Sequence, residues 1–108
     1  MKGFIGEFEE LVLLTIANLA SEAYGVSILN DISERASRKL SIGALHSTLT
    51  RLEEKGYITS HLGEPSQKRG GRRKRYFQLT DSAKVELTNM KSLRDQLWAG
   101  ANLNLSAK

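Results

Sequence analysis

The sequence contains no cysteine, a single proline and a single tryptophan in 108 residues. Without cysteine, disulfides, thiol catalysis and thiolate metal sites are excluded, and the composition is compatible with a reducing cytoplasm. The longest apolar run, residues 11–14, is far too short to cross a bilayer. The amino terminus turns acidic after one lysine, so it does not resemble a signal peptide. We therefore expect a cytoplasmic protein of one small domain that does not enter a membrane.

The sequence also lacks the residue patterns of common catalytic and metal centres. Its two histidines, His46 and His61, have no second histidine or cysteine at metal-ligand spacing. It contains neither a G-x-S-x-G nucleophile elbow nor a phosphate-binding P-loop. We expect a protein that is not an enzyme and that uses no cofactor or metal.

Positive charge is concentrated in the middle of the chain. The net charge is +4, but residues 35–80 hold eleven basic and three acidic side chains, whereas residues 1–34 hold one basic and six acidic side chains. Such a concentration is typical of a surface that contacts a polyanion, although a solvated basic loop would give the same composition. Charge alone does not decide between these two interpretations.

Hydrophobic periodicity and turn residues divide the chain into six elements. We predict helices over 7–21, 26–37, 42–55 and 81–100, and strands over 57–62 and 73–79. Ser41 and Thr80 are expected to cap the third and fourth helices, because a hydroxyl at this position accepts a hydrogen bond from a free amide. Gly56 is expected to end the third helix. The two strands enclose a polar loop and therefore predict a hairpin.

This order of elements predicts a mainly α fold with a small β-hairpin. It is the winged helix-turn-helix arrangement, in which the third helix enters the major groove and the hairpin loop is the wing. We expect residues 1–80 to form the DNA-binding domain and residues 81–108 a C-terminal dimerisation helix and tail. The first helix is apolar on nearly all sides, so its second side is expected to pack against another subunit. The sequence thus predicts a homodimer.

Two segments carry a resemblance to a known family. They are SIGALHSTLTRLEEKGYI, which begins at Ser41, and GGRRKRYFQLT, which ends at Thr80. Together they resemble the PadR family of bacterial regulators, and the resemblance extends over about residues 7–100. The Tyr24–Gly25 pair also fits, and the positions that match are Gly43, Leu49, Arg51, Leu52, Glu53, Gly56, Arg75, Tyr76, Leu79 and Thr80. His46 departs from the pattern, because the family usually has a tyrosine there that supports a phosphate contact.

The resemblance implies a transcriptional regulator, usually a repressor, that binds double-stranded DNA. The single C-terminal helix resembles the short branch of the family, whose members dimerise through their first and last helices. A symmetric dimer would read an inverted repeat. Some relatives in this branch bind aromatic drugs between their subunits, so the resemblance also implies a small aromatic effector.

The third helix and the hairpin loop supply the candidate DNA contacts. Steps of 100° per residue place Gly43, Ser47 and Thr50 opposite the core face, where small and hydroxyl side chains can approach base edges. Six cationic side chains within 68–75 can neutralise phosphates. Together with the positions that the resemblance implies, the predicted contacts are Tyr24, Lys39, Ser41, Gly43, His46, Ser47, Thr50, Arg51, Lys68, Arg69, Arg72, Arg73 and Lys74.

Some of these side chains have plain structural alternatives. Ser47 and Thr50 could simply be solvated, and Arg51 could form an ion pair with Glu53 or Glu54 on its own helix. Arg75 is not expected to reach DNA, because it begins the second strand.

The last helix carries the candidate effector site, formed by Met90, Leu97 and Trp98. A tryptophan can stack on a flat aromatic ligand, but aromatic residues more often pack a core or an interface. Both interpretations stay open. For the whole protein, the alternative is a ligand-binding or protein-interaction module that keeps the winged fold without reading DNA.

Overall fold

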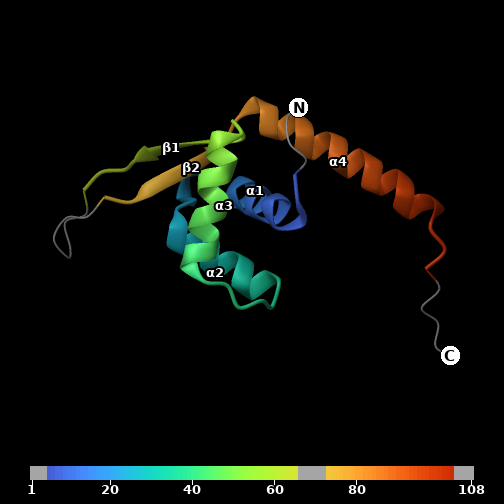
Figure 1. The fold of residues 1–108 in the computed structure, drawn as a ribbon, viewed down its shortest axis with the longest axis horizontal. Coiled ribbons are helices and arrows are strands. Elements are labelled where there is room, and N and C mark those ends of the chain that lie inside the picture. Colours follow the sequence, from blue (N-terminus) through green and yellow to red (C-terminus); the bar gives the residue numbers. More distant parts are fainter. Residues whose placement is uncertain (1–4, 66–72, 104–108) are drawn as a thin grey trace.

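The computed structural model describes residues 5–65 and 73–103. The elements, in chain order, are α1 (Glu7–Leu19), the 3₁₀ turn η1 (Ala20–Glu22), α2 (Gly25–Arg35), α3 (Ile42–Glu54), β1 (Ile58–Leu62), β2 (Arg75–Leu79) and α4 (Asp81–Gly100). The first three helices form a compact group, from which the hairpin extends to one side and α4 to the other (Figure 1). The predicted fold class, mainly helical with one hairpin, is therefore confirmed.

The hydrophobic core lies between the first three helices and the inner face of the hairpin. Each of these elements contributes side chains that are almost fully buried, and burying one aliphatic side chain contributes about 1.5–3 kcal/mol. The main members are Val12, Leu13, Ile16, Ile28, Ile32, Leu45, Leu49, Leu52, Tyr57, Ile58 and Phe77. The predicted core face of α3 is confirmed by the burial of Leu45, Leu49 and Leu52.

The hairpin is a two-stranded antiparallel sheet in which Ile58 pairs with Leu79 and Leu62 pairs with Arg75. The connection between α1 and α2 lies along the edge of β2 that does not pair with β1, because the Phe77 amide donates to the Ala23 carbonyl at 2.9 Å. Tyr24 forms a further bridge to Tyr76 on the same strand. These bonds fix the start of α2 beside β2.

The capping residues are those that the sequence predicts. The Ser41 hydroxyl accepts from the Ala44 amide at 3.0 Å. The Thr80 hydroxyl accepts from the Ala83 amide at 3.2 Å and donates to the Gly56 carbonyl at 2.8 Å. Gly56 follows α3 with a φ of 80°, a conformation that glycine adopts at little cost.

Several element bounds differ from the prediction by one or two residues. α1 ends at Leu19 rather than at residue 21, because Ala20 takes a positive φ of 53° and starts a 3₁₀ turn. α2 runs over Gly25–Arg35, one residue earlier than predicted at its start and two at its end. β2 begins at Arg75, so residues 73 and 74 precede the strand.

The two helices that are expected to meet a second subunit keep apolar side chains exposed in the single chain. α1 buries one side in the core but leaves Leu14 on its surface. On α4, Leu97 and Trp98 are 63% and 65% exposed, and Leu93 is exposed beside them. No helix within residues 5–65 and 73–103 is long and apolar enough to span a membrane.

Candidate nucleic-acid interface

The outward face of α3 carries small and polar side chains. Gly43, Ser47 and Thr50 are all exposed, as the helical period predicts, and Ser41 is exposed at the start of the helix. The opposite face holds α3 in the core, so this outward face is presented on a rigid element. A helix with short side chains can approach a flat or grooved surface closely.

The start of α2 is joined to the loop end of the hairpin by a row of rings. Tyr24 meets Tyr76 edge to face with ring centroids 5.5 Å apart, and His61, the partner of Tyr76 on β1, stacks on the Tyr76 ring at 5.8 Å. The Lys74 ammonium lies 4.3 Å above the Tyr24 ring, a cation–π contact. Gly63 makes room for this packing, because a Cβ there would lie 2.6 Å from the Tyr76 ring.

One open hollow of about 650 Å³ brings several of the predicted contacts together. It is bordered by α3, by the start of α2 and by the residues that enter β2. The predicted DNA-binding residues that line it are Tyr24, His46, Thr50, Arg73 and Lys74. Together with Arg75, three cationic residues therefore line the hollow beside the polar side of α3, where they can attract an anion.

The hairpin is also bonded to α3 by a short polar chain. The Arg75 guanidinium donates to the Ser60 hydroxyl at 3.0 Å, and that hydroxyl donates to the Glu53 carboxylate at 3.1 Å. Arg75 thus contacts the neighbouring strand and also lines the hollow, and its absence from the DNA contacts stays a prediction. The chain fixes the angle between the hairpin and α3.

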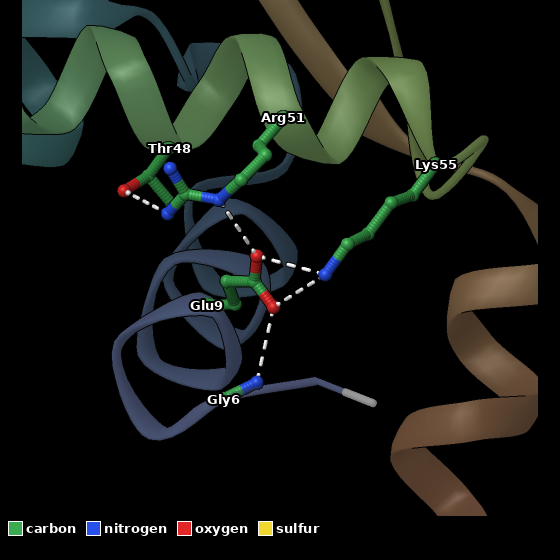
Figure 2. Close-up of polar contacts among 5 residues, drawn as sticks. All are labelled: Gly6, Glu9, Thr48, Arg51 and Lys55. Carbon is green, nitrogen blue, oxygen red and sulfur yellow. Dashed lines mark hydrogen bonds and ion pairs between the residues drawn. The ribbon is translucent and has the colours of Figure 1, made fainter. Parts of the chain in front are cut away.

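Arg51 contacts a residue that local spacing did not suggest. Its Nε donates at 3.2 Å to the carboxylate of Glu9 on α1, and Lys55 donates to the same carboxylate at 3.0 Å (Figure 2). The ion pair of Arg51 is therefore not with Glu53 or Glu54. About half of the Arg51 side chain is exposed, and its contact with DNA stays a prediction.

Some predicted contacts lie elsewhere or outside the described residues. Lys39 is exposed in the connection between α2 and α3 and does not line the hollow. Lys68, Arg69 and Arg72 fall within residues 66–72, which the structure does not describe.

Two apolar residues at the hollow were missed by the sequence analysis. Ile42, the first residue of α3, is 42% exposed, and Val26 on α2 is also exposed. Both line the hollow that contains His46 and Thr50. The helical wheel carried a signal, because it places Ile42 beside His46 and away from the centre of the core face.

The candidate effector residues are brought together only in part. Trp98 borders a second hollow, of about 490 Å³, between α1 and α4, with Leu14 and Leu87 as its apolar neighbours. Met90 packs against the core, and Leu97 is exposed, and neither lines this hollow. Within the described ranges, no group of three or more histidine, aspartate or glutamate side chains could hold a metal ion.

A comparison with protein families found a match that covers most of the chain. The model of the transcriptional regulator PadR-like family matches residues 12–89. A comparison with curated proteins found no match.

Solved structures share the fold. A PadR-like regulator from Bacillus cereus has a TM-score of 0.74 at 20% identity, over 94% of this chain and 93% of that one. A PadR-like transcription factor from Bacteroides fragilis has a TM-score of 0.67 at 24% identity, over 83% and 82%. The PadR protein of Bacillus subtilis, solved in complex with operator DNA, has a TM-score of 0.64 at 18% identity, over 94% of this chain and 51% of that one.

The matched family and these structures are transcription regulators rather than enzymes. The family model covers most of the chain, and the motifs of α3 and the hairpin lie within the matched segment. The chain belongs to the PadR-like family of transcriptional regulators.

Proposed function

We propose that the protein is a sequence-specific transcriptional repressor that binds double-stranded DNA as a homodimer on an inverted repeat. The observation that carries this proposal is the hollow in which α3 meets the hairpin. There, His46 and Thr50 of α3 share one surface with Arg73 and Lys74. A polar helix face beside cations matches the grooved, anionic surface of a duplex.

In this proposal α3 reads base edges in the major groove. Gly43 allows close approach, and the hydroxyls of Ser47 and Thr50 bond to bases or to nearby phosphates. Ile42 adds an apolar surface of the kind that contacts the 5-methyl group of thymine.

In this proposal, cationic side chains and the start of α3 bind the phosphates of the DNA backbone. Arg73 and Lys74 neutralise the backbone beside the hollow, and Lys68, Arg69 and Arg72 continue the same basic segment in the sequence. Ser41 presents its hydroxyl and the first amides of α3 to a phosphate. The remaining backbone contacts are assigned to Tyr24, Lys39, His46 and Arg51.

The dimer is formed by the second sides of α1 and α4. Leu14 on α1 and Leu93, Leu97 and Trp98 on α4 are large, apolar and exposed in the single chain, and covering them with the same surface of a second copy would bury them all. Residues 1–80 then act as the DNA-binding domain and residues 81–108 as the dimerisation helix and tail.

An effector would act on this same interface. The hollow beside Trp98 is apolar on the side of Leu14 and Leu87, and charged on the side of Arg94 and Glu10. A flat aromatic molecule stacked on Trp98 would change the distance between the two α3 helices. The fluorescence of the single tryptophan, titrated with planar drugs, tests this proposal. The Trp98→Ala variant has neither the fluorescent probe nor the stacking surface. The DNA affinity of this variant is therefore measured with and without the drug.

The function is tested by selecting bound fragments from random duplex DNA. We expect an enriched inverted repeat, bound by a dimer in sedimentation experiments. Failure to enrich any sequence, together with weak retention on heparin, would favour the alternative module that does not read DNA. A stable monomer at micromolar concentration would contradict the dimer. Repression is tested separately, with a reporter gene placed behind the selected sequence.

A further inference from the structure

The first turn of α1 binds three other parts of the molecule through three carboxylates. Glu7, Glu9 and Glu10 lie within four residues, and each pairs with a cation from a different segment. Glu7 pairs with the connection after α2, Glu9 with α3 and Glu10 with α4. The cations are Arg38 for Glu7, Arg51 and Lys55 for Glu9, and Arg94 for Glu10.

Glu9 is the buried member of this group, with an exposed fraction of 6%. Figure 2 shows its carboxylate between α1 and α3, with Arg51 and Lys55 reaching it from α3. Lys55 Nζ lies 3.0 Å from both carboxylate oxygens, and the Gly6 amide donates to one of them at 3.0 Å. Arg51 is itself held by a bond from Nη2 to the Thr48 hydroxyl at 3.2 Å.

The charge of this carboxylate is stabilised where it lies. Burial alone raises the pKa of Glu9, but the hydrogen bonds from Gly6, Lys55 and Arg51 and the charge of Lys55 outweigh burial, so its pKa falls below the ordinary value. Glu9 is therefore ionised at neutral pH and pairs with two cations of α3.

Arg51 and Lys55 are four residues apart, so they lie on one side of α3 about one turn from each other. Two cations that converge on one carboxylate fix both the rotation of α3 about its axis and its position along α1. The close-packed core also restrains α3, but hydrophobic contact is not directional, so the two ion pairs add a directional restraint.

We propose that Glu9 is a positioning residue that sets the orientation of α3 relative to α1 and α4, and with it the spacing of half-sites that the dimer accepts. This inference rests on the proposed function, since it assumes a dimer formed by α1 and α4 that reads two half-sites. Glu10 joins the same turn to Arg94 at 2.9 Å, so α3 and α4 are both tied to one segment of α1.

The test compares two isosteric variants, Glu9→Gln and Glu7→Gln. Both remove one negative charge from the same turn, but the Glu7 pair is exposed and does not involve α3. Any general effect of net charge on DNA affinity is therefore shared by both variants, and only the loss of the contact with α3 is specific to Glu9→Gln.

The first measurement is the distance between the two α3 helices in the dimer. The chain has no cysteine, so Glu54→Cys on the exposed side of α3 gives one spin label per subunit. We expect a narrow distance distribution for the parent and for Glu7→Gln, and a loss of that narrow distribution for Glu9→Gln. This measurement does not require DNA.

The second measurement is affinity for duplexes whose half-sites are moved apart one base pair at a time. We expect the preference of the parent for its best spacing over its neighbours to fall by about fivefold or more in Glu9→Gln, with little change for an isolated half-site. Glu7→Gln should keep the parental preference.

A folded Glu9→Gln dimer with the parental distance distribution and spacing preference would overturn the inference and leave the proposed function intact. So would an equal loss of preference in Glu7→Gln, or an equal loss of affinity at every spacing and on the isolated half-site. If Glu9→Gln does not fold, Lys55→Gln removes one of the two cations and is expected to broaden the distribution in the same way. If the parent itself has no preferred spacing, both the inference and the inverted-repeat model fail.

Discussion

The exposed faces of α3 and α4 differ in kind, although both helices project side chains into solvent. On α3 the exposed residues at the outward face are Gly43, Ser47 and Thr50, which are small or polar. On α4 they include Leu97 and Trp98, which are large and apolar. Small polar side chains suit a hydrated, charged partner, whereas a group of exposed large apolar side chains is typical of a surface that another protein covers.

This difference favours different partners for α3 and α4. The hairpin extends to one side of the first three helices and α4 extends to the other side (Figure 1). α1 lies between them, with one side in the core and Leu14 exposed on the side of α4. Substitutions on the exposed face of α4 should therefore weaken the dimer first. Substitutions on the outward face of α3 should affect DNA recognition alone.

The largest expected effect comes from placing a charge on the exposed apolar face of α4. Leu97→Asp should weaken the dimer at least about 100-fold, because an interface would have to bury an unpaired carboxylate. Sedimentation velocity over a range of concentrations measures this change. Ser92→Asp, on the opposite side of α4, is the matched control and should remain dimeric. If Leu97→Asp remains as dimeric as the parent, the exposed apolar face of α4 is not the dimer interface.

A smaller and general effect is expected from the cations that precede β2 at the loop end of the hairpin. Replacing Arg73 and Lys74 together with alanine should weaken binding to all duplexes by roughly 50-fold at about 0.1 M salt, since each phosphate contact contributes about 0.9 to the salt slope. Fluorescence anisotropy on specific and random duplexes measures both the affinity and the slope. Lys84→Ala, on the first turns of α4, controls for loss of positive charge. A loss confined to the selected sequence would contradict the assignment to phosphates.

A selective effect is expected on the outward face of α3. Thr50→Ala should weaken binding to the selected sequence about tenfold and leave random duplexes nearly unchanged, because a lost base contact costs about 1–3 kcal/mol.

Ile42 can be tested by changing the DNA as well as the protein. Replacing thymine by uracil removes only the 5-methyl group, so the parent should lose affinity at one position and Ile42→Ala should lose none there. Additive losses in the double change would show that Ile42 does not contact that methyl group.

The smallest expected effect comes from Glu9, whose carboxylate joins α1 to α3. Glu9→Gln should lower the free energy of unfolding at pH 7 by about 1 kcal/mol, a modest value because the Arg51 side chain is half exposed. The folded pKa of Glu9 is lowered, so its contribution is fully present above the ordinary pKa of 4.5 and is lost as the pH falls through the folded pKa. Urea unfolding of both proteins at pH 7 and at low pH should therefore show a difference that shrinks with acidity. A difference that stays constant would mean that the charge of Glu9 is not responsible.

The sequence predicted what depends on local patterns. Helical periodicity located the buried leucines of α3, and hydroxyl and glycine chemistry located the caps Ser41, Thr80 and Gly56. The same period also placed the outward face of α3. These features follow from residues within one or two turns of each other.

Contacts between distant residues could not be predicted in this way. Arg51 was given partners on its own helix, but it pairs with Glu9, which is 42 residues away, because tertiary packing brings α1 under α3. Met90 was grouped with Trp98 as an effector site, but Met90 packs against the core, whereas Trp98 borders the hollow between α1 and α4. A single sequence carries no signal for the contact between Arg51 and Glu9, although the helical period does place Met90 and Trp98 about 80° apart around α4.

We expect α3 and the residues that enter β2 at the loop end of the hairpin to meet DNA, and α4 to meet a second subunit. Hydrogen exchange of the dimer, measured with and without the selected duplex, tests both halves at once. We expect DNA to slow exchange in the first two turns of α3 and around Arg73 to Tyr76, with little change along the second half of α4, which should already be protected in the free dimer relative to Leu97→Asp. Protection by DNA along α4, with α3 unchanged, would contradict the account.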